Sequence, residues 1–309
     1  MKKVIVTGGA GFIGSHLAEE LARSSDQVII LDNLTTGKMD NIEGLLSRKN
    51  VDFIQGSITD FPVLLELFQN AQYIFHQAAI ANVPQSIENP YASHEANITG
   101  TLNVLLAARD NGVKKVIYAS SCAVYGDTPT LPKREDMLPL PLSPYAVTKL
   151  AGEYYCQAFH QVYGLPTVCL RYFNVYGPRQ DQNSQYAAVI PNFIKMCGEG
   201  SPPVIFGDGE QTRDFIFVKD VVKANVLAAQ SDVCGVFNVS RGESITMNSL
   251  AELIIELVGN KIEPVHQEPR PGDIRYSLAD IAKAKAFGYE PKYGLKDGLA
   301  ETIRWFNGR

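Results

Sequence analysis

The sequence predicts an α/β protein built on a doubly wound parallel sheet, with a smaller α/β domain in its C-terminal part. In the first half of the chain, short β-branched and aromatic runs alternate with longer segments of helical periodicity. This alternation is typical of parallel strands joined by crossover helices. After about Tyr172 the chain changes to short elements interrupted by Gly and Pro, which indicates a second unit.

Six buried strands are expected in the first half, with helices between them. The predicted strands cover residues 4–6, 28–31, 51–54, 73–75, 116–118 and 167–170, and the clearest helical patterns cover 12–23, 62–68, 91–111 and 145–162. Later strand-like runs at 215–218 and 237–239 should return the chain to the first sheet, before helices near 247–258, 281–287 and 295–306. We therefore expect a first domain at 1–172 and a second at 173–309, with a discontinuous boundary because the chain returns around 213–240.

Composition excludes several classes of protein. The 309 residues are 45% hydrophobic and 20% charged, which is typical of a folded soluble chain and excludes disorder, collagen and coiled coil. A net charge of −5 without a concentrated basic surface argues against nucleic-acid binding. No apolar run approaches the ~18–20 residues of a membrane span and no signal peptide is recognisable, so we expect a cytoplasmic protein that does not enter a membrane.

The cysteines and histidines give no sign of a metal centre. The five cysteines have no CxxC spacing, and no two of the five histidines share a ligand spacing on one predicted helix. We expect reduced thiols and a site without a metal ion.

A glycine-rich loop lies between the first predicted strand and the first helix. It reads Thr-Gly-Gly-Ala-Gly-Phe-Ile-Gly from Thr7 to Gly14. Gly8 permits a sharp turn, Gly11 lets backbone N–H groups approach a pyrophosphate at the positive helix end, and Gly14 allows the helix to pack closely on the strand. In this context the spacing predicts a Rossmann-type dinucleotide site, with Phe12 and Ile13 also beside the cofactor.

The end of the second strand indicates which dinucleotide is bound. Asp32 lies 18 residues after Gly14, where a carboxylate can accept hydrogen bonds from the adenosine ribose and repel a 2′-phosphate. Asn33 follows it instead of an arginine, so NAD is favoured over NADP; capping of a turn is the alternative role for Asp32. Further predicted cofactor neighbours follow the third and fourth strands at the same edge of the sheet: Ser57, Ile58, Ala78 and Ala79.

Candidate catalytic groups lie on the helix predicted at 145–162 and at the end of the fifth strand. Tyr145 and Lys149 are four residues apart and share one helical face. A tyrosine with a pKa near 10 is a poor base, but a neighbouring ammonium and the positive nicotinamide ring would lower that pKa. Ser121 ends a central strand, where its hydroxyl can orient a substrate hydroxyl.

Several motifs together make the whole chain resemble the extended short-chain dehydrogenase/reductases, and within them the nucleotide-sugar 4-epimerases of the UDP-galactose and UDP-N-acetylglucosamine type. The motifs are the glycine loop, Asp32-Asn33-Leu34, His76-Gln77-Ala78-Ala79, Ser-Ser-Cys-Ala-Val-Tyr-Gly at 120–126, the Tyr145/Lys149 pair, and Arg-Tyr-Phe-Asn-Val-Tyr-Gly-Pro at 171–178.

The resemblance implies a function and a role for each catalytic residue. Tyr145 would be the base, Lys149 would tune it and hold the nicotinamide ribose, and Ser121 would bridge the sugar hydroxyl to Tyr145. The reaction would be 4-epimerisation of a UDP-hexose through a transient 4-ketose, with NAD regenerated in each cycle. Asn97 matches a helix asparagine of the family that is structural or holds a water. A homodimer through the helices at 91–111 and 145–162 is also implied.

The same resemblance implies the UDP-sugar contacts. Asn174, Arg213 and Arg270 would bind the diphosphate, for which guanidinium groups are well suited. Asp273 would accept from the uridine ribose, and the backbone near Ala188, Val189, Ile205 and Phe206 would surround the uracil. Ser277 matches a position that carries a bulky tyrosine in epimerases restricted to plain hexoses and a small residue in those that accept N-acetylhexosamines. We therefore expect turnover of UDP-GlcNAc and UDP-GalNAc as well as, or instead of, UDP-glucose and UDP-galactose.

Some positions depart from the family pattern, and two alternative functions stay open. Ser57 replaces the usual aspartate at the adenine, Cys122 lies beside Ser121, and the sugar-facing Ala81-Asn82 pair is uncommon. A 4,6-dehydratase is disfavoured because Cys122-Ala123 stand where it needs an Asp-Glu pair. A UDP-glucuronate decarboxylase or 4-epimerase would use the same tyrosine and lysine. A non-catalytic NAD-binding regulator is the alternative from another class.

Overall fold

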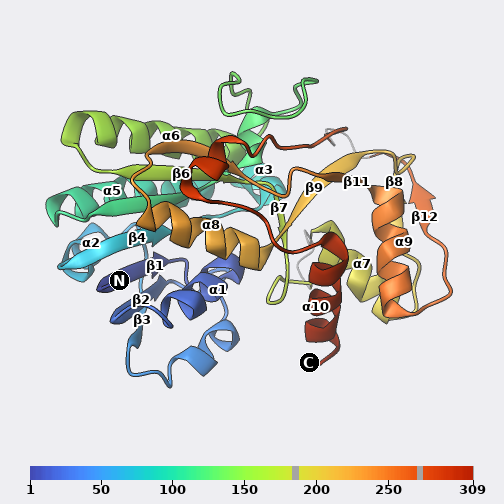
Figure 1. Ribbon diagram of the computed structural model, residues 1–309, viewed down its shortest axis with the longest axis horizontal. Helices are drawn as coiled ribbons and strands as arrows, with labels where there is room; N and C mark the ends of the chain where they lie inside the picture. The colour runs from blue at the N-terminus through green and yellow to red at the C-terminus, as the bar shows by residue number, and fades with distance from the viewer. Residues whose placement is uncertain (183–187, 270–273, 309) are drawn as a thin grey trace.

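The computed structural model describes residues 1–182, 188–269 and 274–308, and its largest element is a parallel sheet with helices on both faces (Figure 1). The strand order is β10-β6-β5-β4-β1-β2-β3. All six strands predicted in the first half are confirmed. Their bounds, with that of β10, are β1 Lys3–Thr7, β2 Gln27–Asp32, β3 Val51–Gln55, β4 Ala71–His76, β5 Lys115–Ser121, β6 Thr167–Tyr172 and β10 Gly235–Val239.

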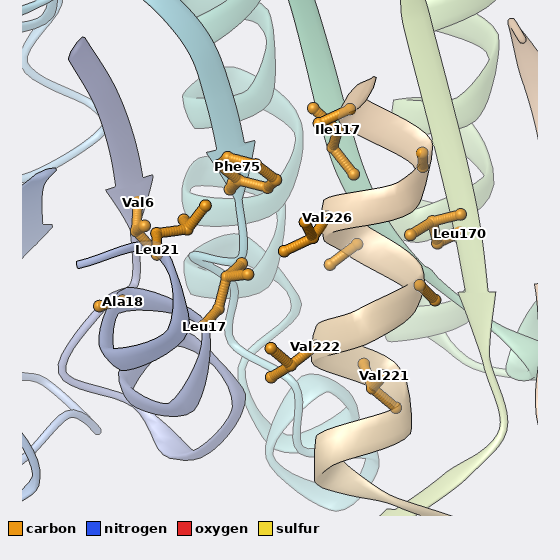
Figure 2. Close-up of a cluster of buried hydrophobic side chains, with 14 of the residues drawn as sticks. Val6, Leu17, Ala18, Leu21, Phe75, Ile117, Leu170, Val221, Val222 and Val226 are labelled. Carbon is orange, nitrogen blue, oxygen red and sulfur yellow. The ribbon is translucent and has the colours of Figure 1, made fainter. Parts of the chain in front are cut away.

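Successive side chains of each strand point to opposite faces of this sheet, and both faces are buried. Val4 and Val6 pack on one face against α1 (Phe12–Leu21) and α8 (Val218–Gln230), as Figure 2 shows for Val6 and its neighbours. Ile5 lies in the core of the other face, which is covered by α2 (Phe61–Leu67), α5 (Gly100–Asp110) and α6 (Pro144–Tyr163). This two-sided burial explains why the strands are nearly continuous apolar runs in the sequence.

The helix predicted at 91–111 is interrupted. The structure has α3 (Val83–Glu88), α4 (Pro90–His94), a π-helical turn at Glu95–Thr99, and then α5. The turn places Asn97 inward, where its side-chain oxygen accepts from the Ile80 N–H at 2.8 Å and its Nδ2 donates to the Ile80 carbonyl at 2.9 Å. The irregular turn therefore serves to clamp the loop that follows β4, in keeping with the frequent occurrence of such bulges at functional sites.

A second core lies beside the sheet, at the right of Figure 1. Two small sheets contribute to this unit: β7 (Asn174–Tyr176), β9 (Thr212–Phe217) and β11 (Ser244–Thr246) form one, and β8 (Val204–Phe206) and β12 (Val265–Gln267) form the other. Its helices are α7 (Val189–Gly198), α9 (Met247–Val258) and α10 (Leu295–Asn307).

The expected return of the chain to the large sheet is correct for one strand and wrong for the other. β10 pairs with β6 in the large sheet, whereas β9, predicted near 215–218, pairs with β7 and β11. The aromatic side chains of β9 explain the difference. The Phe215 and Phe217 rings lie 6.3 and 5.5 Å from the ring centroid of Tyr176, within the second core.

Candidate active site

A cavity of about 360 Å³ lies at the carboxyl ends of the central strands. The strand order reverses between β1 and β4, and ligands of open α/β sheets bind at such a switch point. Every residue predicted to hold the cofactor lines this cavity: Gly8, Gly11, Phe12, Ile13, Gly14, Asp32, Asn33, Ser57, Ile58, Ala78, Ala79, Tyr145 and Lys149. The lining also includes residues that were not predicted, among them Thr35, Thr36, Ile80, Ala96 and Tyr172.

The glycine loop forms a cradle that side chains would fill. Gly8 has φ +67°, and a Cβ there would lie 2.6 Å from the Ala78 nitrogen; a Cβ on Gly14 would lie 2.1 Å from the Gly8 oxygen. Gly11 is the N-cap of α1, and among the described residues no side chain caps this end and none in the first turn is acidic. The free N–H groups and the positive helix end therefore fit the pyrophosphate of a dinucleotide.

We expect Gly8→Ala to lower the free energy of unfolding by about 3 kcal/mol or more, because it adds a close contact to the strain of a positive φ. Gly112→Ala is the matched control, since Gly112 has φ +61° and nothing within 4 Å of its Cβ position. Strain alone should make that variant about 1 kcal/mol less stable. Urea denaturation of both variants measures these changes. Equal decreases in the free energy of unfolding would show that the backbone shifts to relieve the contact with Ala78 without further loss of stability.

Asp32 caps backbone N–H groups and also lines the cavity. Its side chain is buried, with Oδ2 accepting from the Ala10 N–H at 3.0 Å and Oδ1 accepting from the Leu34 N–H at 2.8 Å. These bonds join the glycine loop to the loop after β2. A carboxylate has about four acceptor positions, so capacity for a ribose remains on the side that lines the cavity.

Tyr145, Lys149 and Ser121 meet at the end of β5. Tyr145 is in the first turn of α6, which begins after Ser143, whose Oγ accepts from the Ala146 N–H at 3.2 Å. The Ser121 side chain lies close enough to the Tyr145 phenol to favour its ionised form and so to lower its pKa, against the larger effect of burial. The Lys149 Nζ donates to the Ala119 carbonyl at 2.8 Å and lies 5.9 Å from the ring centroid of Tyr145.

Burial dominates the proton affinities of these groups. Burial raises the pKa of Tyr145 to about 12, while the Ser121 hydroxyl favours the phenolate and opposes this rise. Burial lowers the pKa of Lys149 to about 8, opposed by the negative charge of Glu153. The expectation that the lysine lowers the pKa of this phenol is therefore not met by the chain alone, because desolvation outweighs the other effects and the ammonium is directed at Ala119.

A buried histidine beneath the cavity is neutral and fully hydrogen-bonded. Burial and the charge of Lys149 lower the pKa of His76 to about 3. The Thr101 hydroxyl donates to the Asn97 carbonyl at 2.6 Å, so it accepts from His76 Nε2, 3.0 Å away; Nδ1 then accepts from the Thr7 hydroxyl at 2.7 Å. His76 thus ties β4 to β1 and α5 as a structural group, and its place in the His-Gln-Ala-Ala motif is the sequence signal for it.

Two buried polar groups that the sequence did not identify also support the cavity. Glu153 forms a two-pronged ion pair with Arg171 at 2.7 and 2.8 Å, and Ser120, which lines the cavity, donates to it. Asn225 on α8 contacts the hydroxyl of Tyr172 at 2.8 Å and the amide of Gln77 at 3.1 Å. Neither group was apparent because each depends on residues distant in the chain.

The predicted substrate residues that the structure describes are not part of the lining of this cavity. Arg270 and Asp273 are outside the described residues. Ala188 precedes α7 and Val189 begins it, while Ile205 and Phe206 are in β8.

Three other predicted substrate residues lie on or against the three-stranded sheet. Asn174 is in β7 and Arg213 in β9, while the Ser277 N–H donates to the Thr212 carbonyl at 3.1 Å. Burial raises the pKa of Cys122, the neighbour of Ser121, to about 12, and the positive charge of Arg213 opposes that rise.

Neither a membrane span nor a metal centre is seen in the described part of the chain. None of its helices is both long and apolar enough to cross a bilayer. Within the same residues, no three or more His, Cys, Asp or Glu side chains are grouped so that they could bind a metal ion.

Comparisons with known proteins identify the family. The structure of a UDP-N-acetylglucosamine 4-epimerase from Methanobrevibacter ruminantium M1, in complex with UDP-N-acetylmuramic acid, is 45% identical with a TM-score of 0.97, covering 100% of this chain and 99% of that one. A UDP-glucose 4-epimerase from Thermus thermophilus, in complex with NAD, is 39% identical with a TM-score of 0.89, at 99% coverage of each chain. A putative UDP-glucose 4-epimerase of Methanocaldococcus jannaschii is 39% identical over 98% of this chain and 97% of its own length. The family model described as "NAD dependent epimerase/dehydratase family" matches residues 4–240, and the chain belongs to that family.

Proposed function

We propose that this chain is an NAD-dependent 4-epimerase of UDP-hexoses that accepts UDP-GlcNAc and UDP-GalNAc as well as UDP-glucose and UDP-galactose. The observation that carries the proposal is the position of Tyr145 and Lys149 in the lining of the glycine-loop cavity, with Ser121 at the end of β5 acting on the Tyr145 phenol. Membership of the family and the 4-epimerase relatives support the reaction type.

The chain's own residues would bind the cofactor and move one proton. The glycine loop and the first turn of α1 would hold the NAD pyrophosphate, and Asp32 would accept from its ribose. NAD supplies a reversible hydride acceptor when it is bound. Tyr145 takes the proton of the sugar 4-hydroxyl and later returns it, and Ser121 keeps that hydroxyl and the phenol in line.

The proton affinity of Tyr145 makes the cofactor charge part of this proposal. With a pKa of about 12, the phenol is protonated at neutral pH and is ready to donate. To act as a base it needs more positive charge nearby than Lys149 provides alone, and an oxidised nicotinamide is cationic. Between proton removal and return the sugar must turn over, so binding energy must be concentrated on the UDP rather than on the hexose.

Substrate range is proposed to depend on Ser277. Its small side chain is buried beside β9, and its N–H is bonded to Thr212. Ser277→Tyr should lower kcat/KM for UDP-GlcNAc by about 100-fold or more through overpacking, and change that for UDP-galactose by less than about 3-fold. Ser277→Ala is the control and should leave both near wild type. Equal losses on both substrates in the tyrosine variant would remove Ser277 from this role.

One assay separates this function from its rivals. Purified protein is given UDP-GlcNAc, UDP-galactose and UDP-glucuronate separately, with chromatography of the products and detection of CO₂. Conversion of UDP-GlcNAc to UDP-GalNAc and of UDP-galactose to UDP-glucose supports the proposal. Product or CO₂ from UDP-glucuronate alone would assign the uronate alternatives instead. Retained NAD with no turnover of any of the three, and no effect of Tyr145→Phe on function, would assign a regulator.

A homodimer through the helical segments 91–111 (α4, the π-helical turn and α5) and 145–162 (α6) is also part of the proposal. Large apolar side chains are exposed on α4 and α6: Tyr91 at 86%, Val147 at 49% and Tyr154 at 55%. Such a concentration is typical of a surface that is covered by another molecule. A monomer mass by light scattering at micromolar concentration would contradict it.

A further inference from the structure

Asp214 is a completely buried carboxylate in the middle of β9. Its Oδ1 accepts from the Arg241 N–H at 3.2 Å, and its Oδ2 accepts from the N–H groups of Gly242 and Ala279 at 3.1 and 3.0 Å. A single side chain therefore supplies the acceptors for two loops that are almost 40 residues apart in the sequence. Buried N–H groups left without an acceptor are costly, so this side chain determines where both loops lie.

Asp214 stands where one edge of β9 changes its partner. Residues 215–217 pair with β7, whereas Thr212 forms a parallel bridge to Tyr276, with its N–H donating to the Arg275 carbonyl at 3.0 Å. β11 occupies the opposite edge, pairing with residues 212–214. On the edge of β9 that faces β7 and residues 275–279, the Asp214 carboxylate accepts a hydrogen bond from the Ala279 N–H. On the same edge, the Asp214 backbone carbonyl accepts a hydrogen bond from the Asn174 side-chain amide at 3.0 Å.

Three proposed UDP-sugar contacts converge on this point. Arg213 precedes Asp214 in β9, and the Asn174 side chain donates to the Asp214 carbonyl. Ser277 supplies the middle one of three hydrogen bonds that join residues 275–279 to β9, and the Asp214 carboxylate accepts the last of them, from Ala279. Resting on the proposed function, we infer that Asp214 is a positioning residue for the UDP-sugar: it holds Asn174 and the segment 275–279 at a fixed distance from Arg213 without touching the substrate.

A second carboxylate anchors the same segment and provides a matched control. Asp208 forms a two-pronged ion pair with Arg275, with both distances 2.8 Å, but both side chains are about half exposed. Exposed ion pairs contribute about 0–1 kcal/mol, whereas a buried acceptor facing several N–H groups has no water to replace it. The inference therefore distinguishes Asp214 from Asp208, although both contact this segment.

The test compares Asp214→Asn and Asp208→Asn with wild type. Asparagine preserves the shape of Asp214 but turns an NH₂ group toward N–H donors. The KM for UDP-galactose and the dissociation constant of UDP, measured by titration calorimetry, should each rise by about 10-fold or more in Asp214→Asn, following the cost of an unsatisfied buried donor. The kcat and the amount of bound NAD should stay within about 3-fold. Asp208→Asn should change all of these by less than about 3-fold.

The possible outcomes separate this inference from the proposed function. Absence of UDP-hexose turnover by the wild type contradicts the function. Turnover by the wild type with unchanged KM and UDP affinity in Asp214→Asn, or with a loss confined to kcat or to NAD, overturns the inference alone. If Asp214→Asn does not fold, hydrogen exchange of the wild type decides: UDP should slow exchange of the Gly242 and Ala279 amides, and unchanged rates at both overturn the inference.

Discussion

Tyr145→Phe should reduce kcat by roughly 10²–10⁴-fold, the usual range for removing a general acid–base group. The ring stays buried in the first turn of α6, so the change removes the phenolic oxygen, on which Ser121 acts. Bound NAD and the unfolding midpoint should remain near their wild-type values. Steady-state kinetics with UDP-galactose, together with the absorbance of released cofactor, measure both expectations.

Tyr118→Phe is the matched control for that result. Tyr118 is also buried, its ring centroid lies 5.1 Å from the Lys149 Nζ, and its hydroxyl donates a long hydrogen bond of 3.5 Å to the Lys149 carbonyl. We expect kcat to change by less than about 5-fold, because loss of a long hydrogen bond has a small effect. Comparable losses of kcat in the two variants would mean that turnover depends on any buried phenol near Lys149 and not on proton transfer by Tyr145.

Lys149→Met should also abolish most turnover, by roughly 10²–10³-fold, because it removes the cation that supports the Tyr145 phenolate. The same change should stabilise the fold. The pKa of Lys149 is lowered from 10.5 to about 8 by burial, so the unfolded chain holds this proton more tightly and the buried ammonium costs stability at neutral pH. The variant also loses the hydrogen bond from Lys149 to the Ala119 carbonyl, which offsets part of this effect. We therefore expect the free energy of unfolding, measured with urea at pH 7, to increase by about 1–2 kcal/mol.

The pH dependence of that variant follows from the same pKa. In the wild type the ammonium is present below pH 8 and is lost as the pH rises through about 8, so kcat/KM should fall on the alkaline side. The difference in stability between wild type and Lys149→Met should shrink over the same rise, because the folded wild type then releases its unfavourable proton. Two results would contradict this account. One is a Lys149→Met variant that is less stable than wild type at pH 7. The other is a residual kcat/KM of that variant that still falls above about pH 8 as it does in the wild type.

Local sequence patterns were sufficient for the large sheet and for the cofactor cavity. The apolar runs of β1 to β6 are buried on both faces, and such runs need no distant partner to be recognised. The glycine loop and Asp32 act through local backbone geometry and through the end of a strand, so their positions follow once the strand order is parallel. Tyr145 and Lys149 are likewise related by a single helix.

Tertiary structure decided the properties that depend on distant residues. β9 is as strand-like in the sequence as β10, but only the aromatic packing of Phe215 and Phe217 against Tyr176 directs it to the small sheet. The phenol of Tyr145 has a raised pKa because of burial, which the spacing to Lys149 does not reveal. Asp214 reads in the sequence as an ordinary acidic residue, and its importance comes from N–H groups of Arg241, Gly242 and Ala279. Helical periodicity and loop motifs encode contacts over a few residues, whereas desolvation and the satisfaction of buried polar groups depend on the whole folded chain.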